Sequence, residues 1–180
     1  IKMSPTKLTL ADIFENISVP LPLKNAKVLT VDANEDEKSI SVVLISGDII
    51  DCKVIESFKE LIKAEKNLEK VILKVKYDGL CLKDVAGKKF FDNLTFYLNV
   101  LSPGTQNLFI DSVWSYKDGK ITVKCKNGLE LINVTNCKEL IKKLVKSQLN
   151  ENVEVEFIDE YDVDKFLKEK EEIINSFDPI

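Results

Sequence analysis

The chain has 180 residues and a formal net charge of −4, and it contains neither histidine nor arginine, so all 26 of its basic residues are lysines. Without histidine there is no imidazole base, no imidazole metal ligand and no Ser-His or Cys-His nucleophile pair. Without arginine there is no planar guanidinium for bidentate recognition of phosphate, carboxylate or guanine. A chain of this length can bury its own core as one domain or as two small ones.

Residues 9–18 predict a short amphipathic helix. Thr9, with Asp12 three residues later, is typical of a capping box. The apolar residues that follow share one helical stripe: Leu10, Ile13, Phe14 and Ile17.

The segment VPLPL comes next and predicts an extended connector, because Pro20 and Pro22 disfavour a helix. Its leucines, Leu21 and Leu23, either pack locally or contact a partner. Extended Pro-Leu segments and exposed apolar groups mark partner sites more often than they stabilise a monomer. Both leucines are therefore candidate partner contacts.

Residues 26–78 predict the order strand, strand, helix, strand. AKVLTVD (26–32) and SISVVLI (39–45) form a predicted hairpin across the polar linker ANEDEK. A helix over 51–66 has one apolar face: Val54, Ile55, Phe58, Leu61 and Ile62. In KVILKVKY, apolar residues alternate with Lys70, Lys74 and Lys76, which predicts a strand with one buried face and one largely solvent-exposed face.

Residues 88–101 predict a core helix that stops before Pro103. Its stripe is Phe90, Leu94, Tyr97, Leu98 and Leu101. The strands NLFIDSVWSY and KITVKCK follow, joined by Lys117-Asp118-Gly119, and Asp-Gly between alternating runs is a strong hairpin signal.

The next helix stripe is Cys137, Leu140, Ile141, Leu144 and Val145. It is followed by the strand NVEVEFI and a final helix, DVDKFLKEKEEIINSF, whose KEKEE run lies on a solvated face. The residues of this helix expected to point inward are Val163, Phe166, Ile173, Ile174 and Phe177.

Residues 38–78 and 119–160 share a hydrophobic rhythm and a literal KELIK. The sequence therefore predicts an α+β fold of two tandem small modules, 1–84 and 85–180. Each has the order strand-strand-helix-strand with flanking helices, and a three-stranded mixed or antiparallel sheet covered by helices. The surfaces differ, because Asn152, Glu154 and Glu156 stand where the first module has Lys70, Lys74 and Lys76. This difference predicts two opposite electrostatic faces.

The four cysteines, Cys52, Cys81, Cys125 and Cys137, form no CxxC pair. With no secretory h-region and no apolar stretch of about 18 residues, they indicate core thiols in a soluble, reducing, cytoplasmic protein. The acidic cluster Asp159, Glu160, Asp162 and Asp164 spans one strand-to-helix turn, which favours helix capping over a metal site. Neither a metal nor a cofactor is predicted.

The sequence contains no GxxxxGK[ST], GxGxxG, GxSxG or HExxH motif and no GxxG loop of a KH domain. Trp114 and Tyr116 lie two apart on one predicted strand face, which indicates core or interface packing rather than an RNP pattern. Nucleic-acid binding is disfavoured in a net acidic chain without arginine.

In their joint order, these features resemble the N-terminal region of PolC-type DNA polymerase III, the replicative polymerase of low-GC Gram-positive bacteria. The resemblance covers nearly all of the chain. It is carried by the first strand in KNAKVLTVD, the VILKV strand, the LNVLSPG break, the KITVK strand and the closing V-x-K-F-x-x-x-K helix. One departure is the second strand, SISVVLI, where PolC segments commonly carry aromatic residues, so an aromatic partner surface is not carried over.

The resemblance implies a non-catalytic segment of a much longer polypeptide, whose exonuclease, PHP domain and polymerase site lie further along. It implies an interaction region that tethers the polymerase to the tau subunit of the clamp loader, whose polymerase-binding domain the modules resemble. The residues expected to contact a partner are Leu21, Leu23, Phe58, Trp114 and Tyr116. The alternative is an auxiliary module of the same polymerase that binds single-stranded nucleic acid through Lys70, Lys74 and Lys76.

Overall fold

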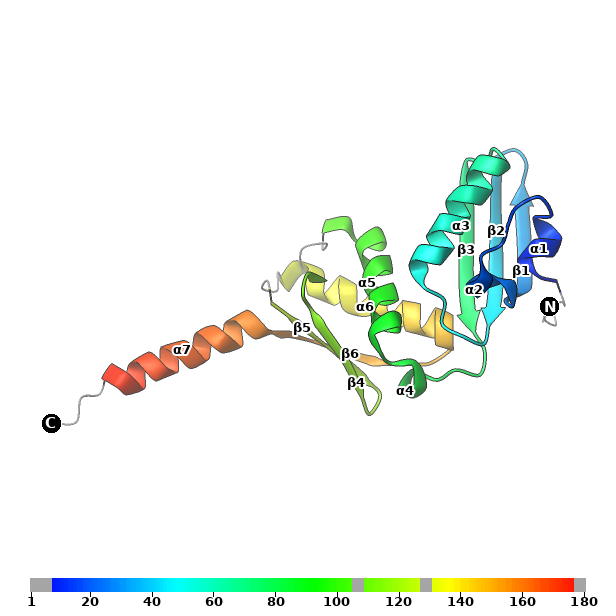
Figure 1. Ribbon diagram of the computed structural model, residues 1–180. Helices are drawn as coiled ribbons and strands as arrows, with labels where there is room; N and C mark the ends of the chain where they lie inside the picture. The colour runs from blue at the N-terminus through cyan, green and yellow to red at the C-terminus, as the bar shows by residue number, and fades with distance from the viewer. Residues whose placement is uncertain (1–7, 105–108, 127–130, 177–180) are drawn as a thin grey trace. The chain divides into compact units, whose positions relative to one another are not determined.

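The computed structural model describes residues 8–104, 109–126 and 131–176, with the side chains of all of these except 131–135 and 160–166 (Figure 1). It confirms the predicted α+β fold, with two three-stranded mixed sheets in the orders β1-β2-β3 and β4-β5-β6. The chain divides into two compact units, one within Ile1–Asn93 and Ser147–Glu151, the other within Leu94–Lys146 and Asn152–Ile180.

The first unit contains the first sheet. Its elements are α1 (Leu10–Ile13), α2 (Leu21–Lys24), β1 (Lys27–Asn34), β2 (Ser39–Ser46), α3 (Cys52–Glu65), β3 (Lys70–Tyr77) and α4 (Leu82–Val85). β1 and β2 form the predicted antiparallel hairpin, and β2 pairs in parallel with β3. A parallel pair needs a crossover connection, which α3 provides.

The alternation of β3 sets the two faces of this sheet as predicted. Its apolar residues are buried: Val71, Leu73, Val75 and Tyr77. Lys70, Lys74 and Lys76 are exposed on the opposite face. The central strand β2 follows the same alternation, with Val42 and Leu44 fully buried.

Helix α3 begins at a local cap, because the Asp51 carboxylate accepts a hydrogen bond from the backbone N–H of Lys53 at 2.9 Å. Its buried residues are Cys52, Ile55, Phe58 and Ile62. Leu61 lies at the edge of the predicted stripe and is 38% exposed. The helix ends before Asn67, whose φ of 50° lies in the left-handed region that asparagine tolerates.

The predicted helix over 9–18 is wrong in length, since α1 is a single turn. One hydrogen bond of the predicted capping box is present: the Asp12 carboxylate accepts from the backbone N–H of Thr9 at 2.9 Å. Phe14 then leaves the helical conformation, with φ −113° and ψ 68°. Phe14 and Ile17 are nevertheless both buried, so their burial does not require a continuous helix.

The prediction of an extended VPLPL connector is also wrong, because the segment forms the helical turn α2. Pro20 precedes the turn and Pro22 lies within its first turn. The first N–H groups of a helix have no intrahelical partner, so proline costs no hydrogen bond there.

The second unit contains the second sheet. Its strands are β4 (Val113–Lys117), β5 (Lys120–Cys125) and β6 (Glu154–Asp159), and its helices include α7 (Glu160–Ser176). The division between the units falls within α5 (Lys88–Leu101) and α6 (Leu131–Leu149). β4 and β5 are antiparallel, and β5 and β6 are parallel, which repeats the topology of the first sheet.

The predicted hairpin at Asp118-Gly119 is confirmed. Both residues have positive φ, 49° and 80°, as a two-residue hairpin turn requires. The core of this unit includes Ile121, Val123 and Cys125 of β5, all fully buried. It also includes the fully buried stripe of α6, which is Cys137, Ile141 and Val145.

In two helices, residues that were predicted to be buried near the C-terminal end are exposed. In α5, Phe90, Leu94 and Leu98 are buried, but Leu101 in the last turn is 55% exposed. In α7, Ile173 and Ile174 are each 59% exposed rather than inward. The side chains of Val163 and Phe166, and Phe177 altogether, lie outside the described residues.

Candidate partner-binding surfaces

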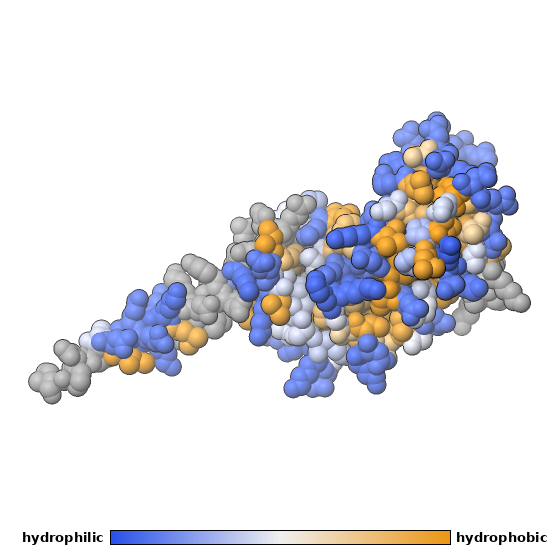
Figure 2. Space-filling model, in the orientation of Figure 1, coloured by the Kyte–Doolittle hydropathy of each residue, from blue (hydrophilic) through white to orange (hydrophobic). Residues whose placement is uncertain are grey.

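Of the two connector leucines, only Leu21 is available to a partner. It is 77% exposed, whereas Leu23 in the same turn is fully buried. The prediction of Leu23 as a partner contact is therefore wrong, because its side chain fills the core of the first unit. On the visible face of this unit, Figure 2 shows exposed hydrophobic residues between hydrophilic ones.

Phe58 is not a surface contact either. It is 1% exposed, and its ring packs edge-on against that of Phe14, with the centroids 6.2 Å apart. The prediction failed because helical spacing marks an apolar stripe without showing how much of it the rest of the fold covers.

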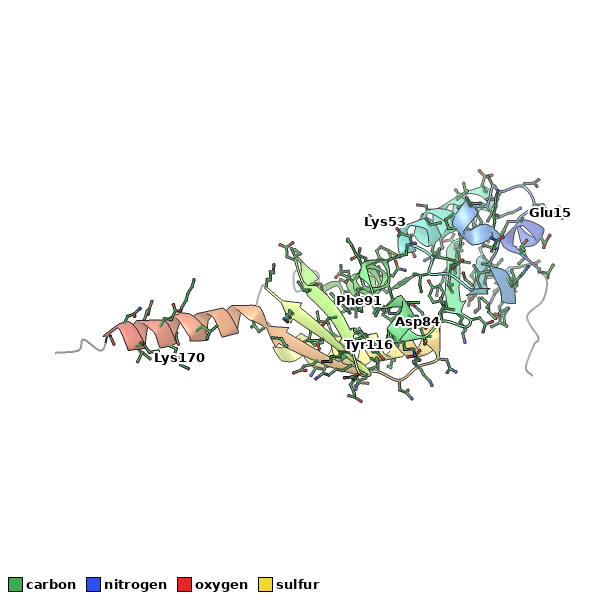
Figure 3. The ribbon with its side chains drawn as sticks, turned by 60° about the horizontal axis from the view of Figure 1, so that its bottom comes forward. Glu15, Lys53, Asp84, Phe91, Tyr116 and Lys170 are labelled. Carbon is green, nitrogen blue, oxygen red and sulfur yellow. The ribbon has the colours of Figure 1, made fainter. Side chains whose placement is uncertain are left out.

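Trp114 and Tyr116 are half-buried on the edge strand β4, on the side of the sheet that carries its core. The Trp114 indole donates to the Ser112 hydroxyl at 3.0 Å, and its ring lies 6.0 Å from that of Phe109. Figure 3 labels Tyr116 on this strand. The two side chains take part in packing, and an interface function for their exposed parts stays a prediction.

The opposite face of the first sheet, here called the first open face, has no buried residue. Its members are Lys27, Thr30, Asp32, Asn34, Ser39, Ser41, Val43, Ile45, Lys70, Ile72, Lys74 and Lys76. Val43, Ile45 and Ile72 are half-buried and form an aliphatic strip. Among the described residues, the exposed Lys70 and Lys74 beside it form no ion pair.

The corresponding face of the second sheet, the second open face, differs in charge. Its members are Val113, Ser115, Lys117, Lys120, Thr122, Lys124, Glu154, Glu156 and Ile158. Lys120 and Glu156 are paired at 2.7 Å across β5 and β6. The prediction of two opposite electrostatic faces is wrong, because lysines on β4 and β5 offset the acidic residues of β6.

The Lys120–Glu156 pair gives a pH-dependent prediction. Its hydrogen bond and charge hold the pKa of Glu156 below the ordinary value. A lowered carboxyl pKa contributes stability above the unfolded-state pKa, and this is lost as the pH falls through the folded-state pKa. We expect Lys120→Met to raise the pKa of Glu156, measured by NMR titration of the side-chain carboxyl carbon. Lys117→Met is the control, and an unchanged Glu156 pKa in Lys120→Met contradicts the assignment.

The cysteines behave as core thiols with one exception. Cys52, Cys125 and Cys137 are buried, and desolvation raises the pKa of Cys52 and of Cys125 to about 11. Cys81 is half-buried, and its thiol donates a hydrogen bond to the Asp84 carboxylate, which raises its pKa. Asp84 lies on α4 (Figure 3).

We expect iodoacetamide at mildly alkaline pH to alkylate Cys81 before the three buried thiols. Asp84→Asn should accelerate this reaction roughly three- to tenfold, because removing the carboxylate lowers the thiol pKa and increases the thiolate fraction. Peptide mass spectrometry over time measures it, with Asp78→Asn as an exposed control. Equal rates in Asp84→Asn and the unmodified chain would contradict the prediction.

A hollow of about 490 Å³ lies at one end of the first sheet, between α1, the β1–β2 turn and the α3–β3 connection. Phe14, Ile40 and Leu68 are among its apolar lining residues, and Lys38 and Lys66 are among its charged ones. Lys38 and Asn67 have positive φ, which the hairpin turn and the end of α3 require. The backbone strain is thus explained by the fold.

Among the described residues, no group of three or more His, Cys, Asp or Glu could hold a metal ion. In the acidic cluster, Asp159 ends β6, and the side chains of Glu160, Asp162 and Asp164 lie outside the described ones. No helix in the described part of the chain is long and apolar enough to cross a membrane. Comparison with family models, curated proteins and solved structures finds no match.

Proposed function

We propose that this chain is a non-catalytic interaction region of a PolC-type replicative DNA polymerase, acting in the cytoplasm to tether the polymerase to the tau subunit of the clamp loader. The observation that carries the proposal is that two modules of one topology each leave one sheet face open. Buried faces stabilise each module, which leaves the other face available for binding. The element order on which the PolC resemblance rests is the order in the structure.

Leu21 is the residue of the expected partner set that is most accessible. Its turn is anchored by the fully buried Leu23, so the backbone that carries Leu21 is held in place. Binding at Leu21 therefore requires little ordering of the backbone.

Calorimetric titration of tau into the purified chain tests the tether. We expect saturable binding at or below tens of micromolar, weakened by Leu21→Ser. Leu101→Ser is the matched control, because Leu101 is also an exposed leucine in a helix, on α5. An absence of binding at this concentration, at low and physiological salt, would remove the proposal.

The second candidate function is that of an auxiliary module that binds single-stranded nucleic acid. Lys70, Lys74 and Lys76 favour it, since they lie exposed on one face of one strand. Three lysine–phosphate contacts predict a slope of about −2 for log affinity against log salt concentration. Fluorescence anisotropy with a labelled 20-residue oligothymidylate measures this slope, and undetectable or salt-independent binding eliminates the candidate.

A further inference from the structure

The hollow at the hairpin end of the first sheet lies where the core of the first unit is incomplete. Val31 of β1 pairs with the fully buried Val42 of β2, which places Val31 on the core side of the sheet. Ala33, two residues later, lies on the same side. Yet Val31 is 45% exposed and Ala33 is exposed too. This end of the core side therefore has apolar surface that the single turn of α1 does not cover.

The lining of the hollow is mostly apolar and comes from separate parts of the chain. Its apolar members are Ile13, Phe14, Ala33, Ile40 and Leu68. The ring of Phe14 is held by its edge-on contact with Phe58, so this wall is in place before a ligand arrives. The volume of about 490 Å³ is within the range of small-molecule sites, roughly 300–1,000 Å³. Such sites are also mainly apolar, with a few polar groups that orient the ligand.

Two lysines add positive charge to this apolar lining. Lys38 lies at the β1–β2 turn, and Lys66 lies at the end of α3. The carbonyl of Lys38 accepts from the N–H of Glu69 at 2.8 Å, which ties the turn to the α3–β3 connection. In the described part of the chain, neither lysine forms an ion pair.

The acidic member of the lining is Glu35. Two lysines and one glutamate give the lining a net charge of +1. This charge favours a ligand that carries a single negative charge and disfavours a cation. A carboxylate can accept charge-assisted hydrogen bonds from lysine ammonium groups, and these are stronger beside apolar surface than in bulk water.

We propose that the hollow binds a small aliphatic or aromatic monocarboxylate, with its apolar body on Ile13, Ile40 and Leu68 and its carboxylate near the two lysines. The body gains by leaving water, and the charge fixes which end points outward. This inference goes beyond the proposed function and does not rest on it, because neither Leu21 nor the lysines of β3 line the hollow.

NMR titration of the whole ¹⁵N-labelled chain with octanoate tests the site. We expect saturable shifts of the backbone amides of Ile13, Ile40 and Leu68. The dissociation constant should be about 1–10 mM, as a ligand of about ten non-hydrogen atoms allows. Octanol and octylammonium have the same aliphatic body without the negative charge. Octanol should bind more weakly than octanoate, and octylammonium at least tenfold more weakly.

Two sets of variants separate the charge from the cavity. Lys38→Met with Lys66→Met keeps two long apolar side chains and should make octanoate bind no better than octanol. Lys63→Met with Lys70→Met is the matched control, because these lysines are exposed but do not line the hollow, and it should leave the preference unchanged. Ala33→Trp should abolish the binding of both ligands, because its indole fills the hollow from an exposed strand position. The spectrum of each variant shows whether it is folded.

The proposal is overturned if the three amides show no saturable shift, or if octanol binds the unmodified chain as tightly as octanoate. An equal loss of preference in the control variant overturns it as well. If another part of the chain covers the hollow, octanoate cannot enter and the first of these results follows. Tighter binding of the peptide acetyl-Ala-Ala-Leu than of octanoate would assign the hollow to the carboxyl end of a peptide instead.

Discussion

Replacing Asn93 with leucine is expected to destabilise the first unit by about 2–4 kcal/mol, because it leaves two buried backbone groups without partners. Asn93 is 3% exposed. Its side-chain oxygen accepts from the N–H of Cys52 at 2.9 Å, and its amide donates to the carbonyl of Ile50 at 2.8 Å. The same side chain thus holds both ends of the Ile50–Cys52 segment, where α3 begins.

Urea unfolding, followed by circular dichroism, measures the loss. Asn152→Leu is the control, since Asn152 is exposed, and it should change the free energy of unfolding by about 0.5 kcal/mol or less. A stability loss in Asn93→Leu no larger than that of the control would show that the two hydrogen bonds are dispensable.

Phe58→Ala is the second large effect, with an expected cost of about 3–5 kcal/mol, as for other buried aromatic truncations. The substitution removes a 1% exposed ring and its edge-on contact with Phe14. Part of the cost is the cavity that remains, which the surrounding helix and sheet fill only partly.

Leu61→Ala on the same helix is the matched comparison, because Leu61 is 38% exposed and should cost about 1 kcal/mol or less. Urea unfolding of both variants decides between the two interpretations of Phe58. If Phe58→Ala kept its stability and instead weakened partner binding, the residue would be a surface contact and its burial in the core would be refuted.

The parts of the fold that local rules determine could be predicted from the sequence. Strand β3 has strict alternation, and the turn at Asp118-Gly119 has the residue pair that a tight hairpin requires. Because residues 38–78 and 119–160 share one hydrophobic rhythm, the sequence also predicted two modules. The exposure of Lys70 and Lys74 followed from the same alternation.

The parts that failed depend on contacts between distant residues. Leu21 and Leu23 are chemically identical and two residues apart, yet one is exposed and the other buried, since the neighbouring elements decide which is covered. Phe58 is covered partly by Phe14, 44 positions earlier in the chain. No local pattern contains that pairing.

No pattern in the sequence indicated that Asn93 is buried. A polar residue beside Leu94 on an amphipathic helix is expected to lie at the boundary with solvent. Its burial is explained only by the Ile50–Cys52 backbone, about 40 residues away, which needs a donor and an acceptor together. The charge balance of the second open face was missed for a similar reason, because Glu156 was considered without Lys120, with which it pairs diagonally across β5 and β6.

The central position of β2, paired on both edges, has a consequence for how the first sheet opens. Its backbone is bonded to β1 on one side and to β3 on the other, whereas each outer strand has a neighbouring strand along its full length on one side only. Fraying therefore starts at β1 or β3 and reaches β2 last, so the amides of β2 should exchange with deuterated solvent most slowly. The strand that carries Val43 and Ile45 is then the most persistent part of the sheet, and the lysines beside them lie on strands that open sooner.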